Sequence, residues 1–100
     1  MLIWIPVDRE DEKNAKIQKV INAKKWALID FDEGVIKSTQ FFDKKEDFKD
    51  WADFIILENQ YESYIEYLNE GLVVLTVRNE ETIEEIIEAF KFKELDEIGF

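Results

Sequence analysis

The sequence predicts an α/β domain organised around the segment from Phe54 to Phe90. This segment alternates two short apolar runs with two stretches of helical period, which is a β-α-β-α pattern. The pattern implies two buried parallel strands joined by a right-handed helical crossover. An apolar run at the start of the chain, a glycine-containing hairpin and a short amphipathic stretch precede it. We therefore expect the order β-β-β-α-β-α-β-α in a single domain spanning residues 1–100.

Three strands are predicted in the first half of the chain. Leu2 to Val7 is an apolar run suited to a buried strand, and the charged segment 9–24 that follows reads as a surface loop with at most one helical turn. Lys25 to Phe31 and Val35 to Phe42 flank Asp32-Glu33-Gly34, a loop typical of a hairpin. The first hairpin strand is apolar on both faces, which places it inside the sheet. The second is more polar, as edge strands are.

A short helix and a fourth strand are predicted next. Phe48, Trp51 and Ala52 fall three and four residues apart within the stretch from Lys44 to Ala52, which indicates one apolar side of a helix. The apolar run from Phe54 to Leu57 follows at once and is predicted to be a strand buried in the sheet.

Two longer helices are predicted on either side of a strand from Leu72 to Val77. Between Gln60 and Asn69, the apolar stripe that we expect to contact the sheet consists of Tyr61, Tyr64, Ile65 and Leu68, and Tyr67 falls outside it. Thr82 and Glu85 have the spacing of a capping box. The last helix, which they begin, has its apolar stripe at Ile83, Ile86, Ile87 and Phe90. We expect the tail from Lys91 to Phe100 to pack on the domain or to contact a partner.

Charge and composition exclude several classes of protein. The chain has 24 acidic and 13 basic residues and a formal net charge of -11, which disfavours binding to nucleic acid or to an anionic membrane. No apolar run approaches the roughly 20 residues that a membrane-spanning helix needs. Neither a signal peptide nor a cysteine is found, so we expect a cytoplasmic protein without disulfides.

Five stretches carry a resemblance to a known family, namely IWIPVD, NAKKWALIDFDEGVI, ADFIIL, YIEYLNEGLVVLTV and ETIEEIIEAF. Over residues 1–90 the chain resembles the dinitrogenase iron-molybdenum cofactor biosynthesis proteins, which are small nitrogenase accessory factors and cofactor carriers. The resemblance implies a ribonuclease-H-like fold: a mixed five-stranded sheet of order 3-2-1-4-5 with helices on both faces. It also implies an iron-molybdenum or iron-sulfur cluster as the cargo.

The chain departs from that family where the cluster would bind. Lys19-Val20-Ile21 stands where the family commonly has histidine, phenylalanine and glycine, and Glu58-Asn59-Gln60-Tyr61 stands where it has a glycine-rich loop. The whole sequence has neither histidine nor cysteine, the side chains that hold metalloclusters. The resemblance therefore implies a non-catalytic accessory or binding protein, and the departures indicate that it lacks the usual cluster ligands.

A ligand site is predicted at the loops that follow the parallel strands, where open α/β sheets bind their ligands. The candidate residues are Asp8, Lys19, Glu58, Asn59, Gln60 and Tyr61. No catalytic residue and no resident metal site is predicted. One alternative is a metal-dependent hydrolase in which Asp8 and Glu58 hold magnesium. The other is a protein-interaction module that binds another protein, or a second copy of the chain, through Val35 to Phe42 or the tail.

Overall fold

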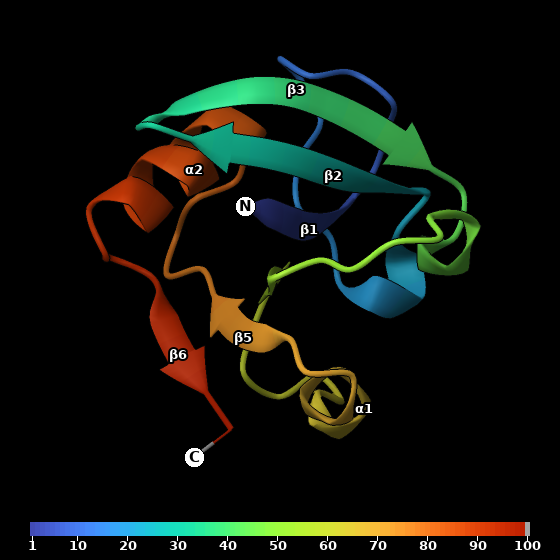
Figure 1. Cartoon of the computed structure of the whole chain (residues 1–100). Helices are drawn as coiled ribbons and strands as arrows, with labels where there is room; N and C mark the ends of the chain where they lie inside the picture. The colour runs from blue at the N-terminus through green and yellow to red at the C-terminus, as the bar shows by residue number, and fades with distance from the viewer. Residues whose placement is uncertain (100) are drawn as a thin grey trace.

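The computed structural model describes residues 1–99 and is built on one six-stranded mixed sheet (Figure 1). Its strands are β1 (Leu2–Val7), β2 (Lys25–Asp32), β3 (Val35–Phe42), β4 (Phe54–Leu57), β5 (Val73–Thr76) and β6 (Asp96–Ile98). They lie in the order β3-β2-β1-β4-β5-β6. β4 runs parallel to β1 and to β5, and the other neighbouring pairs are antiparallel.

The sheet contains the predicted order 3-2-1-4-5, but the prediction of five strands was wrong. β6 pairs antiparallel with β5, with Val74 opposite Ile98 and Thr76 opposite Asp96. The residues of β6 are too few and too acidic to stand out as a strand in the sequence. Leu95 and Ile98 pack against the core, which confirms that this part of the tail returns to the domain. Phe100 lies outside the described residues.

The predicted helices are confirmed only in part. α2 (Ile83–Lys91) begins at Thr82 with both hydrogen bonds of the predicted capping box. The helix predicted from Gln60 to Asn69 forms only as the short α1 (Ile65–Asn69), and the helix predicted from Lys44 to Ala52 is a single 3-10 turn, Lys45–Asp47. Within residues 1–99 no helix is long and apolar enough to cross a membrane.

The prediction of which tyrosine is buried was wrong for two residues. Tyr61 is 87% exposed, whereas Tyr67, expected outside the apolar stripe, is 7% exposed. The reason is local, because α1 begins only after Tyr64 and the helical stripe therefore does not extend back to Tyr61. Residues 58–62 are instead held as a loop by side-chain hydrogen bonds to their own backbone.

One helix packs on each face of the sheet, as the predicted architecture requires. α2 contributes Ile83, Ile86 and Ile87 to a core that also contains alternate residues of β1 and β2. Tyr67 of α1 belongs to a second core on the opposite face. This second core also contains Trp4, Leu28, Ile55, Leu57, Leu72 and Val74. The alternation of side chains along β1 and β4 thus divides the apolar residues between two layers.

The hairpin and the edge strand were predicted correctly. Glu33 and Gly34 have φ values of 52° and 79°, and glycine tolerates this left-handed conformation without steric cost. β3 lies at one edge of the sheet and most of its side chains are exposed. Figure 1 shows β2 and β3 as the long curved pair that covers one side of α2.

Candidate functional site

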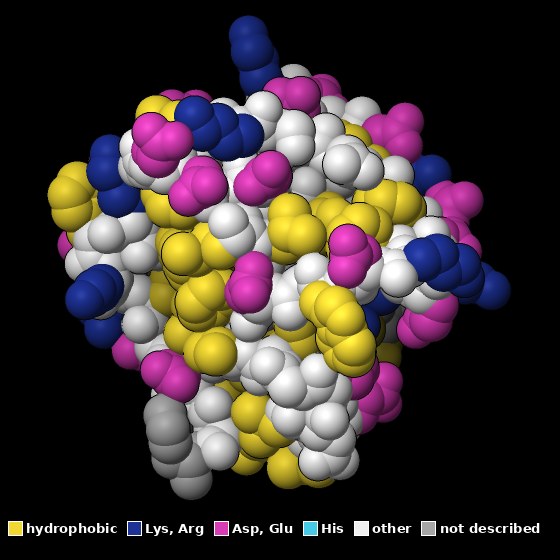
Figure 2. All heavy atoms as spheres, viewed as in Figure 1, with side chains coloured by type: hydrophobic (Ala, Val, Ile, Leu, Met, Phe, Trp, Pro, Cys, Tyr) yellow, Lys and Arg dark blue, Asp and Glu magenta, His cyan; other side chains and the backbone are white. Residues whose placement is uncertain are grey.

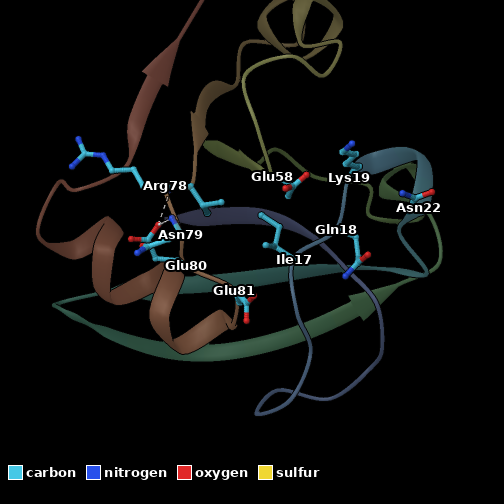
Figure 3. A pocket seen from close by; sticks show the side chains of 10 residues that line it. Ile17, Gln18, Lys19, Asn22, Glu58, Arg78, Asn79, Glu80 and Glu81 are labelled. Carbon is cyan, nitrogen blue, oxygen red and sulfur yellow. Dashed lines mark hydrogen bonds between the residues drawn. The ribbon is translucent and has the colours of Figure 1, made fainter.

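A cavity of about 390 Å³ lies at the carboxyl ends of β4 and β5, the edge of the sheet predicted for a ligand. Three loops line it. Gln18, Lys19 and Asn22 come from the loop after β1, and Glu58 follows β4. The loop after β5 supplies Arg78, Asn79, Glu80 and Glu81, so that the cavity is bounded mainly by polar side chains (Figure 3).

Asp8 organises the loop after β1 and does not line this cavity. Its Oδ1 accepts hydrogen bonds from the backbone N–H of Lys16 at 2.9 Å and from Nε of Arg9 at 3.3 Å, and its Oδ2 lies 3.2 Å from Nη2 of Arg9. Partial burial acts to raise the pKa of Asp8, but the Lys16 N–H and the Arg9 guanidinium outweigh it and lower that pKa overall. Both oxygens of Asp8 are therefore committed to holding the loop.

Glu62, which the sequence reasoning missed, ties the loop after β4 to the loop after β1. Its Oε1 accepts the backbone N–H of Val20 at 2.7 Å. Its Oε2 accepts the N–H groups of Glu58 and Asn59 at 3.1 and 3.2 Å. Asn59 and Glu62 have the spacing of a capping box, and this spacing could have predicted that the Glu62 side chain binds the backbone N–H of Asn59. The carboxylate of Glu62 sets the shape of this edge of the site.

The other predicted residues divide between two cavities. Glu58 lines the 390 Å³ cavity, and its Oε2 accepts the side-chain amide of Asn59 at 3.0 Å. Asn59 and Tyr61 line a neighbouring cavity of about 310 Å³, and Lys19 lines both. Gln60 is exposed and lines neither. The structure thus places Lys19 beside Glu58 in the 390 Å³ cavity and beside Asn59 and Tyr61 in the 310 Å³ cavity.

Most of the charged side chains around the 390 Å³ cavity already make an ion pair or a hydrogen bond within the protein. Arg78 Nη2 lies 3.0 Å from Oδ1 of Asp96, and its side chain points away from the other labelled residues toward β6 (Figure 3). This hydrogen bond raises the pKa of Arg78. Glu81 pairs with Lys16 at 3.8 Å, and Glu80 accepts the N–H of Arg78 at 2.9 Å.

Lys19, Glu58 and Glu80 are the charged side chains of this cavity that make no ion pair with another described residue. Of these, Glu80 already accepts the backbone N–H groups of Arg78 and Asn79 through its Oε1, which leaves Lys19 and Glu58. One ammonium, one carboxylate and the amides of Gln18, Asn22 and Asn79 can therefore hydrogen-bond a polar group.

The donor set does not fit a metallocluster. The sequence contains no histidine and no cysteine, and no group of three His, Cys, Asp or Glu residues within residues 1–99 is arranged to hold a metal ion. Clusters of iron and sulfur are held by thiolate or imidazole ligands, which this cavity cannot supply. A site shared by Asp8 and Glu58 would require Asp8 to release Lys16 and Arg9.

A separate cavity of about 490 Å³ is apolar and lies where β1 and β4 begin, at the opposite end of these strands. Phe31, Phe54, Leu75, Phe90 and Leu95 are among its lining residues. Figure 2 shows hydrophobic side chains gathered on the surface between α2 and β6. Apolar surface of this kind is more typical of a contact with another molecule than of a polar ligand site.

No family model matches the sequence, and no curated protein matches it. Solved structures do share its fold. A protein from Methanocaldococcus jannaschii provisionally named a dinitrogenase is similar in its crystal structure, with a TM-score of 0.78, 20% identity and coverage of 99% of this chain and 95% of that one. An NMR structure of the same protein, whose organism is there named Methanococcus jannaschii, gives a TM-score of 0.77, 20% identity and coverage of 100% of this chain and 94% of that one.

A protein from Thermotoga provisionally named NifB and placed in the DUF35 family is also similar. Its TM-score is 0.70 at 16% identity, with 96% of this chain and 91% of that chain covered. At these identities the likeness shows a common fold over nearly the whole chain.

Proposed function

We propose that this protein is a cytoplasmic, non-catalytic accessory or binding protein of ribonuclease-H-like fold, related to the nitrogenase cofactor-carrier proteins. The observation that carries the proposal is the polar cavity of about 390 Å³ at the carboxyl ends of β4 and β5. The likeness in fold to proteins provisionally named dinitrogenase and NifB supports the relationship.

The ligand that fits this cavity best is a basic group presented by a partner protein. Three glutamates and two cationic side chains line it, and Asp96 already holds one of the cations, Arg78. The net charge of -11 repels an anionic cofactor and attracts a cationic partner. We therefore assign the carboxylate of Glu58 to recognition of an arginine or lysine side chain.

Incubation with an iron-sulfur cluster under anaerobic conditions tests whether the chain acts as a cluster carrier. Because no thiolate or imidazole is present, we expect the protein to leave gel filtration colourless. An apo-ferredoxin with its cysteine ligands serves as the positive control. Co-elution of protein and cluster absorbance would overturn the assignment of a partner's basic group as the ligand.

Magnesium titration tests the hydrolase alternative. Asp8 is held by Lys16 and Arg9, so we expect the amide resonances of Asp8 and Glu58 to stay in place as magnesium is added. A joint, saturable shift of both resonances would instead favour the two-carboxylate metal site.

A second candidate function, a protein-interaction module, is favoured by the edge strand β3. Val35 and Ile36 of this strand are 51% and 39% exposed, and its outer edge is unpaired within the described sheet. Such an edge can accept a strand from a partner or from a second copy of the chain. Light scattering coupled to size exclusion, with Ile36→Lys as the variant, measures self-association. A wild type that stays monomeric at high concentration removes the homo-oligomer.

A further inference from the structure

Residues 43–52, which connect β3 to β4 and which we call the strap, are held to the domain by side chains. Among the described residues, the backbone of residues 44–52 makes hydrogen bonds only within the strap. The contacts with the rest of the chain come from the side chains of Asp43, which pairs with Lys25, and of Lys45, Phe48 and Ala52. The strap can therefore separate from the sheet without breaking a backbone hydrogen bond to it.

Lys45 places its ammonium inside a cage of three aromatic rings. Its Nζ lies 5.9 Å from the ring centroid of Trp4, 5.7 Å from that of Trp26 and 5.2 Å from that of Tyr67. Oε1 of Glu70 lies 3.3 Å away, and the Lys45 side chain is only 10% exposed. Several aromatic faces around one cation, with a carboxylate beside them, form the arrangement by which proteins recognise alkylammonium groups.

The cage belongs to the sheet and to α1, and the strap contributes no ring to it. Trp4 comes from β1, Trp26 from β2 and Tyr67 from α1. Trp4 and Tyr67 are 4% and 7% exposed, and Trp4 contacts Trp26 edge to face at 6.0 Å. Trp4 and Tyr67 belong to the second core and Trp26 packs against it, so the core supports the three rings independently of the Lys45 side chain, and Phe48 of the strap adds one further contact to Trp4.

A cavity of about 220 Å³ lies alongside Lys45 and reaches the surface at Trp51, which is 82% exposed. Its carboxylates, from Glu46, Asp50 and Glu70, outnumber its single ammonium, that of Lys45. Such a lining raises the local concentration of cations. The cavity has the chemistry of an entrance to the cage for a positively charged group.

We propose that the cage of Trp4, Trp26 and Tyr67 is a binding site for an alkylammonium ligand, and that Lys45 is its resident occupant. An external ammonium enters beside Glu70, displaces the Lys45 side chain and frees the strap. The site lies apart from the cavity lined by Glu58 and does not depend on the function proposed for that cavity. A small quaternary ammonium and a partner's lysine share this chemistry, so choline and N-acetyl-lysine amide are used as separate probes.

The test compares Lys45→Ala with Lys44→Ala, which removes the adjacent exposed lysine and leaves the cage filled. We expect choline to bind Lys45→Ala about tenfold or more tightly than the wild type or Lys44→Ala, because the cage is vacated. The indole N–H resonances of Trp4 and Trp26 report the binding. The uncharged isostere 3,3-dimethylbutanol should bind Lys45→Ala about tenfold more weakly than choline. Tighter binding of choline than of N-acetyl-lysine amide indicates a small quaternary ammonium as the ligand, and the reverse order indicates the lysine of a partner protein.

The proposal is overturned if choline leaves the indole resonances of folded Lys45→Ala unmoved, or if the uncharged isostere binds it equally well. Should Lys45→Ala fail to fold, the wild type supplies the test. We expect the three rings to shift the ε-methylene resonance of Lys45 upfield, and choline should move it toward the position of a free lysine. An ε-methylene that stays in place, against a sodium chloride control of equal ionic strength, refutes displacement.

Discussion

Replacing Glu62 by alanine removes the carboxylate that joins two of the loops at the candidate site. The backbone N–H groups of Val20, Glu58 and Asn59 all donate to this one side chain, at 2.7, 3.1 and 3.2 Å. Glu62→Ala leaves all three donors without a protein acceptor. The loop after β4 then loses its attachment to the turn Val20–Asn22.

The expected cost of Glu62→Ala is moderate because Glu62 is only half-buried. A hydrogen bond to a charged group contributes about 1.5 to 3 kcal/mol, and water can replace part of what is lost at a half-exposed site. We expect the three bonds together to contribute about 2 kcal/mol to the free energy of unfolding. In a domain of this size, that loss lowers Tm by roughly 10 °C.

Urea unfolding of Glu62→Ala and Glu66→Ala measures this contribution. Glu66 lies on the same segment, is exposed, and its side chain accepts no hydrogen bond from a described residue. Hydrogen exchange at the amides of Val20, Glu58 and Asn59 should quicken in Glu62→Ala alone. Equal unfolding free energies for the two variants, or unchanged exchange at these amides, would refute the role assigned to Glu62.

Three further outcomes follow from individual side chains. The pKa of Asp8 is lowered in the folded state, so its ionised side chain stabilises the fold above the unfolded-state pKa, and this stabilisation is lost as the pH falls through the folded-state pKa. Asp8→Asn should therefore lower the free energy of unfolding at pH 7 and have no effect in acid, which urea unfolding at pH 7 and in acid measures. Thr82→Ala removes the cap of α2 and should lower the free energy of unfolding by about 1 kcal/mol in urea, with Glu84→Ala as the control. The pKa of Tyr67 is raised to about 12, mainly by burial and further by four nearby glutamates. Alkaline titration followed by tyrosinate absorbance should therefore show a step near that pH, and Tyr67→Phe should remove the step.

The sequence was sufficient for the elements whose own residues determine their structure. β1, β4 and β5 are buried on both faces and appear as apolar runs, and α2 has both a capping box and a regular stripe. The hairpin after β2 was visible because Gly34 occupies a left-handed position that few other residues tolerate.

Elements that depend on distant residues could not be predicted. The stretch from Lys44 to Ala52 has helical spacing but forms only one 3-10 turn. Lys45 and Phe48 already contact the ring of Trp4 in this conformation, so a longer helix is not needed to place them there. β6 forms because β5 presents a free edge, which no pattern within Asp96–Ile98 reveals.

At the candidate site, sequence reasoning located the strand-end loops and two side chains that line the larger cavity, Lys19 and Glu58. It overlooked Glu62 because the three amides that Glu62 binds come from two loops far apart in the chain. It also overlooked Arg78 and Glu80, which lie in the loop after β5 and line the same cavity. The predicted order 3-2-1-4-5 places the ends of these two parallel strands side by side, so the residues that follow Val77 were the available signal.

The central claim, that the cavity at the ends of β4 and β5 binds a partner's basic side chain, is tested most directly by NMR titration with N-acetyl-arginine amide. We expect saturable shifts of the amide resonances of Lys19, Glu58 and Asn79, and their loss in Glu58→Gln but not in Glu66→Gln. The neutral analogue N-acetyl-glutamine amide should produce none. Shifts confined to the Trp4 and Trp26 indoles, or an unchanged response in Glu58→Gln, would contradict the claim.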